Sequence, residues 1–173
     1  RELCRENGVE FRSGRGDVAA YARDKGLGTE EAARKMRYAF LESAAAALGA
    51  DRIATAHTAD DNAETMLFNL ARGSGARGLS GIPPVRGNII RPMLCVTRAQ
   101  VEKYLQSRGA QWRTDSTNLT DDYARNRIRH NAVPVLRDIN PAFAAAAART
   151  AALLREDDDY LTSLARDFIA AEL

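Results

Sequence analysis

Residues 56–65 read Ala56-His57-Thr58-Ala59-Asp60-Asp61-Asn62-Ala63-Glu64-Thr65, and they are the most informative stretch of the chain. A short apolar run over residues 53–56 ends here in a histidine and three carboxylates, and a helical pattern follows at once. Asp60 and Glu64 are four residues apart and Asp61 and Glu64 three apart, so all three carboxylates share one face of a helix. Three acids in the first turn after a strand form a site for a cation, which could be a metal ion, an ammonium or a guanidinium group.

The same three acids also suit a purely structural role. Side-chain oxygens at the start of a helix accept hydrogen bonds from its unpaired N–H groups, and negative charge there complements the helix dipole. Acidic residues are common in first turns for this reason. Spacing alone therefore leaves two interpretations open, a helix cap and a cation site.

Strands and helices alternate along the rest of the chain. Short apolar runs predict strands at residues 9–13, 52–56, 88–91 and 111–113. The helices that we expect run over about 17–25, 29–48, 60–72, 97–108, 123–131 and 141–173. The alternation predicts an α/β fold with a parallel sheet, in which residues 57–64 fall at the carboxyl end of a strand, where the catalytic residues of such sheets lie.

Capping and stop signals set the expected ends of these helices. Asp17, Thr29 and Thr97 are expected as N-caps, and a glycine follows each of the three helices that they start. Pro134 is expected to interrupt the helix that begins near residue 123, and Asn140-Pro141 signals the start of a new one. Residues 72–84 are rich in glycine and end in two prolines, so we expect a loop there.

The composition narrows the classes of protein. A chain of 173 residues is long enough for one domain with a real core, and 45% hydrophobic with 28% charged residues is ordinary for a soluble protein. Cys4 and Cys95 are the only cysteines, which leaves no disulfide framework or zinc cluster and fits a reducing cytoplasm. No apolar run is long enough to cross a bilayer, so we expect no membrane partner.

Basic residues gather in one region, although the net charge of +2 is too small to indicate a partner. The cluster suggests a surface that binds phosphate groups, or else a solvated helical face. Its members are Arg113, Arg125, Arg127, Arg129, His130 and Arg137.

A second pair of arginines, Arg34 and Arg37, lies on one predicted helix with a spacing of three residues. Their planar guanidinium groups could clamp a phosphate, or they could pair with Glu30 or Glu31.

The glycine-rich segment 72–81 directly follows the acidic helix and carries Arg72 and Arg77. It suits a loop that approaches a polyanion and closes over a site, although a plain connection has the same composition. The other glycine pair, in residues 13–17, is interrupted by Arg15, and we interpret it as a turn.

Taken in order, these segments resemble the bacterial tRNA(Ile)-lysidine synthetases, which belong to the PP-loop (N-type) ATP pyrophosphatases. Each motif alone is common, but the ordered set extends over nearly the whole chain. The motifs are Glu31-Ala32-Ala33-Arg34 with Arg37-Tyr38, Ala56-His57-x-x-Asp60-Asp61-x-x-Glu64-Thr65, Arg72-Gly73-Ser74-Gly75, Gly78-Leu79-x-Gly81, Arg91-Pro92, Trp112-x-x-Asp115-x-x-Asn118, Arg125-Asn126-x-Ile128-Arg129 and Asn140-Pro141.

The resemblance implies a fold and an activity. The fold is a Rossmann-like parallel-sheet domain of the adenine nucleotide alpha hydrolase-like type. The activity is that of a cytoplasmic ligase that joins L-lysine to C2 of the wobble cytidine of tRNA(Ile) with the anticodon CAU. ATP first adenylates the C2 carbonyl oxygen, with release of pyrophosphate, and the ε-amine of lysine then displaces AMP. ATP and Mg²⁺ are the implied cofactors.

The resemblance also implies roles for individual residues. Asp60, Asp61, Glu64 and Arg37 are expected to be catalytic; Asp61 and Glu64 would hold the lysine, and Asp60 would support them or bind Mg²⁺. The expected contacts to the nucleotide or its phosphates are His57, Arg34, Arg37, Arg125 and Arg129. The expected contacts to RNA are Arg72, Gly73, Ser74, Gly75, Arg77 and Asn126.

One departure from the family pattern concerns its phosphate loop, Ser-Gly-Gly-x-Asp-Ser after the first strand, which the 173 residues do not contain. We therefore expect a domain truncated at its N-terminal strand, a partial catalytic domain over residues 1–138 and a helical extension over 139–173 that acts as a linker. Alone, this chain is expected not to adenylate RNA. A sheet without its first strand exposes an edge that a second copy could pair, so a homodimer is one expected arrangement.

Three other functions remain alternatives at this point. A tRNA cytidine thiolase of the same ATPase group would need cysteines for sulfur chemistry, and Cys4 and Cys95 are too few and too far apart in sequence. A non-catalytic RNA-binding module would use only the basic surface. An acidic metal-binding helical protein would use only the carboxylate cluster.

Overall fold

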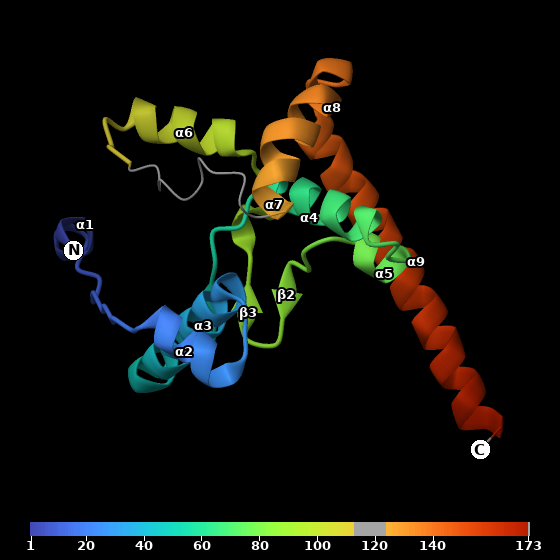
Figure 1. Ribbon diagram of the computed structural model, residues 1–173, viewed down its shortest axis with the longest axis horizontal. Helices are drawn as coiled ribbons and strands as arrows, with labels where there is room; N and C mark the ends of the chain where they lie inside the picture. Colours follow the sequence, from blue (N-terminus) through green and yellow to red (C-terminus); the bar gives the residue numbers. More distant parts are fainter. Residues whose placement is uncertain (113–123, 173) are drawn as a thin grey trace. The chain divides into compact units, whose positions relative to one another are not determined.

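The computed structural model describes residues 1–112 and 124–172 of the chain. The chain divides into two compact units, Arg1–Ile53 and Ala54–Leu173 (Figure 1). Mixed helices and short strands confirm the predicted α/β class.

The first unit consists of α1 (Glu2–Glu6), α2 (Val18–Lys25) and α3 (Thr29–Leu48), and α2 packs against α3. Asp17 caps α2 as predicted, because its side chain accepts a hydrogen bond of 2.9 Å from the backbone N–H of Ala20. The cap of α3 corrects a prediction: Gly28 holds this position in extended backbone, and Thr29 is already the first helical residue.

The strand expected at residues 9–13 is absent, and residues 9–16 have no regular structure. The end of this segment, at Gly14 and Gly16, lies against α3, and Val9 and Phe11 lie beside α1. A side chain at Gly14 would come within 2.9 Å of the Phe40 ring, and one at Gly16 would meet Met36. The alternating pattern was therefore misleading, because a strand needs a ladder partner as well as apolar alternation.

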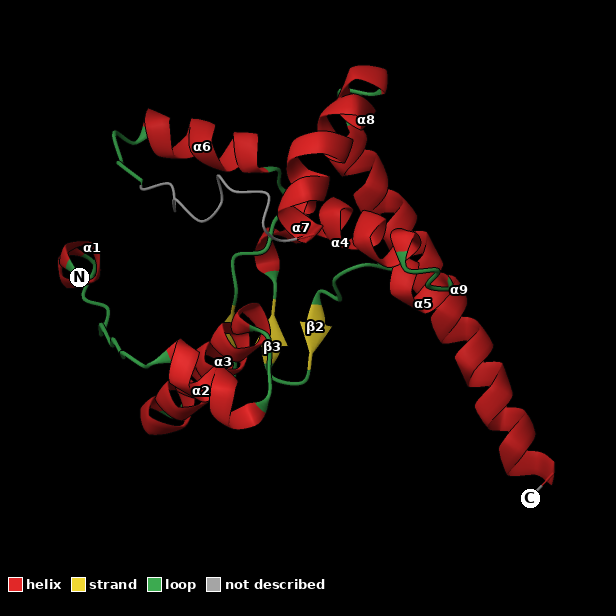
Figure 2. Ribbon diagram, in the orientation of Figure 1, coloured by secondary structure: helices red, strands yellow, loops and turns green. Residues whose placement is uncertain are grey.

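The second unit contains the remaining elements, which Figure 2 distinguishes by type. They are β1 (Ile53–Ala54, shared with the end of the first unit), α4 (Ala59–Ala71), α5 (Ala76–Leu79), β2 (Val85–Arg86), β3 (Ile89–Ile90), the 3₁₀ helix η1 (Pro92–Cys95), α6 (Arg98–Ser107), α7 (Ala124–Arg127), the π-helical turn η3 (Ile128–Ala132), α8 (Val133–Ile139) and α9 (Phe143–Glu172).

The sheet of the described residues has the order β1-β3-β2. Its strands are shorter than predicted, with two residues each. β2 and β3 form an antiparallel hairpin, in which Val85 opposes Ile90. This hairpin was not predicted from the parallel pattern. The expected strand at 88–91 is present as β3, and Thr55 after β1 donates a backbone hydrogen bond of 3.0 Å to Ile90.

Two helical segments differ from the prediction. The loop expected at residues 72–84 contains the short helix α5. Pro134 does not interrupt the basic helix, because α7, η3 and α8 follow one another without a break from residue 124 to 139. Proline lies in the first turn of α8, directly after the wide π turn. A missing N–H is tolerated in a first turn, so the chain can remain helical.

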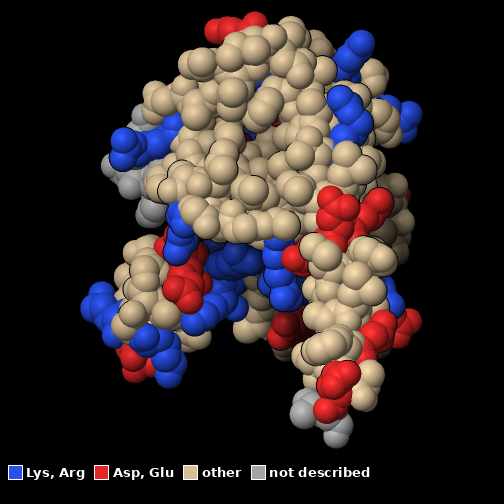
Figure 3. All heavy atoms as spheres, turned by 90° about the vertical axis from the view of Figure 1, so that its right-hand side faces the viewer, with Lys and Arg blue, Asp and Glu red and all other residues tan. Residues whose placement is uncertain are grey.

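The last helix, α9, spans 30 residues. Its first half packs on α4 and α5, where Arg155 donates hydrogen bonds to the carbonyl oxygens of Ser80 and Ile82. Its second half carries exposed apolar side chains, including Leu161 and Phe168, and acidic residues that Figure 3 shows as red atoms near its grey end. Among the described residues, no helix combines the length and the apolar character that a membrane crossing requires.

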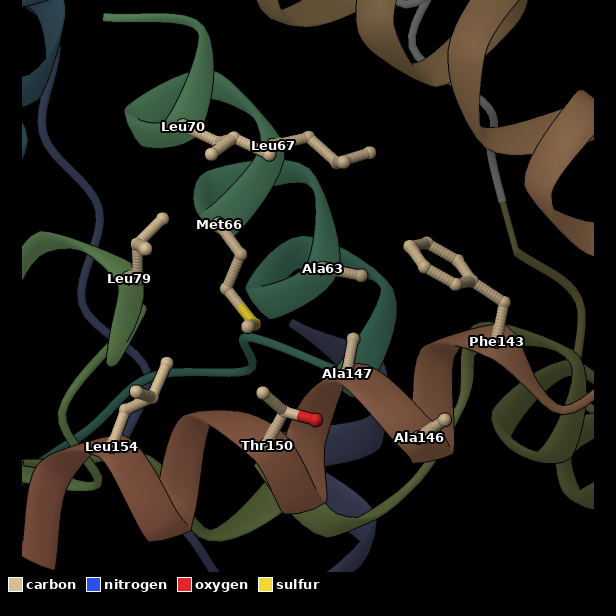
Figure 4. A pocket seen from close by; sticks show the side chains of 10 residues that line it. All are labelled: Ala63, Met66, Leu67, Leu70, Leu79, Phe143, Ala146, Ala147, Thr150 and Leu154. Carbon is tan, nitrogen blue, oxygen red and sulfur yellow. The ribbon is translucent and has the colours of Figure 1, made fainter. Parts of the chain in front are cut away.

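The core of the second unit lies between α4 and α9. Small side chains, Ala63 on α4 with Ala147 and Ala151 on α9, are buried and let the two helices approach closely. Figure 4 shows Ala63 and Met66 directed toward α9, above a cavity of about 300 Å³ with an apolar lining. This packing fixes the position of α4 and of the acidic cluster at its N-terminus.

Candidate functional site

The acidic cluster begins with the N-terminal cap of α4. Thr58 and Asp61 form a capping box: the Thr58 N–H donates to Asp61 Oδ2 at 2.8 Å, and the Asp61 N–H donates to Thr58 Oγ1 at 3.5 Å. Each side chain thus satisfies a backbone N–H that the helix itself leaves unpaired. One oxygen of Asp61 therefore has the capping role that spacing had left open.

Glu64, one turn further along α4, is buried, with 3% of its surface exposed. Arg129 approaches it with two nitrogens, Nε at 2.6 Å from Oε1 and Nη2 at 2.8 Å from Oε2. Arg125 adds a third contact, from Nε to Oε2 at 3.2 Å. The cation that the carboxylates bind in this structure is therefore guanidinium.

The second oxygen of Asp61 has weaker contacts. Its Oδ1 atom lies 3.5 Å from Arg129 Nη2 and 3.8 Å from Arg125 Nη2, and 24% of the side chain is exposed. Arg125 also donates to the Asp61 carbonyl oxygen at 3.1 Å. Asp61 Oδ1 is thus held less tightly by the two arginines than either oxygen of Glu64.

Asp60 binds a different pair of elements. Its Oδ2 accepts a hydrogen bond of 2.6 Å from the backbone N–H of Arg98, at the start of α6, and its Oδ1 pairs with Arg137 of α8. The three carboxylates of α4 therefore connect α6, α7, η3 and α8 to one helical turn.

Electrostatics keep Arg129 charged. The hydrogen bond to Glu64 raises the pKa of the Arg129 guanidinium above its usual value, with further attraction from the carboxylates of Glu64, Asp61 and Asp60. Burial acts in the opposite direction, and the hydrogen bond outweighs it.

A metal ion has no ready site here. Within residues 1–112 and 124–172, no group of three or more His, Cys, Asp and Glu side chains is placed to hold one. Both oxygens of Asp60 already accept from nitrogen donors. The described acidic residues therefore do not fit a Mg²⁺ site in this arrangement.

The other expected nucleotide contacts lie in two places. His57 Nδ1 is 3.0 Å from Thr55 Oγ1, between β1 and α4. Arg34 and Arg37 are exposed on α3 of the first unit, each within 6 Å of the Tyr38 ring, at 5.7 and 5.9 Å. Their expected contacts to a nucleotide remain predictions.

The expected RNA contacts surround the short helix α5 and the start of α7. Arg72 stacks over the Phe68 ring at 5.2 Å, Gly73 has a positive φ of 74°, and Gly75 caps α5. The backbone of Ser74 donates to Asn69, Arg77 is exposed on α5, and Asn126 is half-buried on α7. Arg113 of the basic cluster, and Asp115 and Asn118 of the motif that begins at Trp112, lie outside the described residues.

Sequence reasoning missed two residues that hold the site together. Asn62 is buried on α4, and its side-chain oxygen accepts from the Ile82 N–H at 2.7 Å. Arg91 is 4% exposed and donates to the Pro83 carbonyl oxygen at 2.6 Å. A polar residue on the inward face of an otherwise apolar helix was the available signal for Asn62. The sequence held no comparable signal for the burial of Arg91.

Comparison with known proteins identifies what the chain is similar to. Residues 1–136 match the model of the PP-loop domain family. The chain is 46% identical to a tRNA(Ile)-lysidine synthase of Bacteroides thetaiotaomicron, over 82% of this chain and 33% of that protein. It is 47% identical to the protein of the same name from Parabacteroides distasonis, over 78% of this chain and 31% of that protein.

A third relative, the tRNA(Ile)-lysidine synthase of Geobacter sulfurreducens, is 45% identical over 87% of this chain and 32% of its own length. The chain thus spans about a third of the length of the curated relatives that it matches. These similarities confirm the family resemblance found in the sequence.

Proposed function

We propose a function from one premise: the chain belongs to the PP-loop domain family. On this premise we infer that it forms part of the catalytic domain of an enzyme that ligates L-lysine to C2 of the wobble cytidine of tRNA(Ile) with the anticodon CAU. The observation that carries the proposal is identity of 45–47% to three proteins named tRNA(Ile)-lysidine synthase. ATP is the proposed source of the activating AMP group.

The proposed reaction has two balanced steps. The C2 carbonyl oxygen of the cytidine attacks the α-phosphorus of ATP, a new O–P bond forms, and pyrophosphate leaves. The ε-nitrogen of lysine then attacks C2, loses a proton and displaces AMP as the C–O bond breaks. Lysine arrives as an ammonium ion with a reference pKa of about 10.4, so the second step needs an acceptor for protons.

Asp61 is the residue that we propose for that acceptor. Its Oδ1 atom has only long contacts to Arg129 and Arg125, at 3.5 and 3.8 Å, while its other oxygen is fixed by the cap of α4. A fixed carboxylate costs little to orient when an ammonium ion binds. Glu64 has a different proposed role, because its two oxygens already bind Arg125 and Arg129: it keeps these guanidinium groups beside the reacting groups.

Arg125 and Arg129 are proposed to stabilise the negative charge that develops on the transferred phosphate group. They can do so only with the part of each guanidinium that does not face Glu64. Mg²⁺, a homodimer and a cytoplasmic location complete the proposal. For Asp60 to bind Mg²⁺, its carboxylate would have to release the Arg98 N–H and Arg137.

The test is lysidine formation by a full-length enzyme that carries these 173 residues in its catalytic domain, supplied with ATP, L-lysine and a transcript of tRNA(Ile) with the anticodon CAU. We expect AMP, pyrophosphate and modified nucleoside in equal amounts, and no product from a transcript with uridine at the wobble position. Asp61→Asn should raise the KM for lysine roughly tenfold, because one charge-assisted contact is lost, and lower kcat at least about 100-fold, because the proton acceptor is lost. Asp138→Asn, an exposed carboxylate of α8, is the matched control and should change neither.

Other outcomes favour the alternatives. Transfer of sulfur would indicate a thiolase, and RNA binding without turnover of ATP would indicate a binding module. Binding of Mg²⁺ that is lost in Asp61→Asn, with no effect of lysine, would indicate a metal-binding protein. Each of these results would contradict the proposed ligase.

A further inference from the structure

The basic cluster near residue 125 divides into two groups with different partners. Arg125 and Arg129 point to α4 and bind Glu64. Arg127 lies between them in sequence and has no ion pair in the part of the chain that the structure describes. Residues four apart share one face of a helix, whereas a residue midway between them lies on another face. Arg125 and Arg129 therefore have a structural role toward α4, and the charge of Arg127 lies on a different face without an acidic partner among the described residues.

Arg127 lines a groove between α4 and the α7–η3 segment, two parts of the chain that are in direct contact and lie side by side in Figure 1. The groove has a volume of about 610 Å³, within the range of about 300–1,000 Å³ that small-ligand sites occupy. Its floor is apolar, with Phe68 and Ala71 from α4 and Ile128 and Ala132 from η3.

Among the described residues that line this groove, the only charged side chains are those of two arginines. Arg72, at the end of α4, lines it together with Arg127, and no acidic residue is among its described lining. Arg72 is held over the Phe68 ring, with its Cζ atom 5.2 Å from the ring centroid, and like Arg127 it forms no ion pair with a described residue. A site with two unneutralised guanidinium groups around an aromatic and aliphatic floor suits a ligand that is both anionic and flat.

We propose that this groove binds one unstacked nucleotide of single-stranded RNA, with its base against Phe68 and Ile128 and its adjoining phosphates at Arg72 and Arg127. RNA is recognised mainly where bases are unstacked, as in loops, and aromatic side chains and arginine planes provide stacking surfaces for such bases. The inference rests on the proposed function, which brings an anticodon loop to this domain. It adds Phe68, Arg127 and Ile128 to the expected RNA contacts.

The test measures binding, not catalysis. A fluorescein-labelled anticodon stem-loop with the anticodon CAU is titrated with the purified protein and with Arg127→Gln, Arg72→Gln and Phe68→Leu at several salt concentrations. Arg149→Gln is the matched control, because it removes one exposed arginine from α9 in the same unit. Circular dichroism spectra establish that each variant is folded.

We expect each groove arginine variant to weaken binding on the order of 10-fold, as a lost charge-assisted hydrogen bond would. Each should also make the plot of log K against log[salt] less steep: its negative slope should shrink in magnitude by about 0.7, the value for one phosphate contact on a single strand. Phe68→Leu should weaken binding without changing this slope, because it removes stacking and no charge. Arg149→Gln should match the unmodified protein in both measurements.

Two results would overturn the groove assignment. One is equal binding by Arg127→Gln, Arg72→Gln and Arg149→Gln. The other is displacement of the stem-loop from the groove by ATP alone, with a loss of ATP affinity in Arg127→Gln, which would assign the groove to the free nucleotide. Failure of the proposed function looks different: RNA would bind in a manner that depends on Arg127, but no lysidine would form.

Discussion

Two guanidinium nitrogens of Arg129 donate hydrogen bonds to the two carboxylate oxygens of Glu64, at 2.6 Å and 2.8 Å. The two residues are 65 positions apart in the sequence. The fork of an arginine matches the two oxygens of a carboxylate, so this pair is both charge-assisted and fixed in orientation. Glu64 has 4% of its side chain exposed, and the pair is therefore largely withdrawn from water. Removing one partner of such a pair costs more than the pair contributes, because it leaves the other charge buried and unpaired.

The first prediction concerns this buried charge. Glu64→Gln should lower the free energy of unfolding by about 3 kcal/mol, because Arg125 and Arg129 would both lose their carboxylate. Urea denaturation followed by the fluorescence of Trp112, the only tryptophan, measures the change.

Glu156→Gln is the matched control for that experiment. It makes the same chemical change at an exposed position of α9 and should alter stability by less than about 0.5 kcal/mol. Equal losses in the two variants would show that the Glu64 ion pair does not hold α7 and η3 against α4.

The second prediction concerns pH. A group whose pKa is raised in the folded protein contributes stability that is complete below its unfolded pKa and is lost only as the pH rises through its folded pKa. The guanidinium of an unfolded arginine already keeps its proton throughout the usual pH range, so the contribution of Arg129 should stay constant there. The stability difference between the protein and Arg129→Gln should be the same at about pH 8 and pH 10. A steady decline over this interval would contradict a raised pKa for Arg129.

Much of the local structure could be predicted because its causes are local. Asp17 caps α2, Thr97 caps α6, and the strand before α4 is followed at once by the acidic turn. In each case the donor and acceptor lie within a few residues of each other, so the sequence contains both. The same holds for Asp61, whose capping role was one of the two interpretations that spacing allowed.

The pairing of acids with arginines could not be predicted in the same way. Both groups were identified, but as separate binding sites for lysine and for phosphate. Arg137 lies 77 residues from Asp60, and Arg125 lies 61 from Glu64, so only the packing of α7 and α8 on α4 brings them together. Opposite charges far apart in sequence do not reveal whether they bind each other or a ligand.

The third prediction compares two capping boxes of the same design. Thr58→Ala and Thr97→Ala each remove the hydroxyl that accepts from the N–H three residues later, at Asp61 and Gln100. Thr97→Ala should cost about 1 kcal/mol, the usual value for a lost cap. Thr58→Ala should cost about 2 kcal/mol, because Thr58 is buried and its hydroxyl donates to the charged carboxylate of Asp61 at 2.9 Å, whereas the half-buried Thr97 donates to the neutral amide of Gln100 at 3.1 Å.

Thermal unfolding of the two variants, followed by circular dichroism, gives the comparison. If Thr58→Ala proves no more costly than Thr97→Ala, the cap of α4 is independent of the acidic cluster. In that case Asp61 would not need its Oδ2 bond to hold Oδ1 toward a ligand.

The fourth prediction concerns the close approach of Gly81 to α4. Gly81 has a φ of 67°, and a β-carbon added there would fall on the side-chain oxygen of Asn62. That oxygen accepts the Ile82 N–H at 2.7 Å, and Asn62 is 4% exposed. Gly81→Ala should therefore lower the free energy of unfolding by about 3 kcal/mol, the sum of a strained left-handed backbone and a buried N–H without a partner.

Gly87 isolates the first of these two costs, because it has a φ of 62° and nothing lies within 4 Å of its added β-carbon. Gly87→Ala should consequently cost only about 1 kcal/mol, and the difference between the two glycine variants measures the clash with Asn62.

The Asn62→Ala background gives a second control, because it removes the side chain that clashes most closely with the new methyl group and leaves the contact of 3.3 Å with Met66. There, Gly81→Ala should cost no more than Gly87→Ala, whereas in the unmodified protein the gap should be about 2 kcal/mol. Urea denaturation of the five variants, which are Asn62→Ala and each glycine variant in both backgrounds, provides these values. If the difference in unfolding free energy between the two glycine variants is the same in both backgrounds, the added β-carbon is accommodated without moving Asn62. The hydrogen bond from the Ile82 N–H to Asn62 would then not be what holds residues 81–84 against α4.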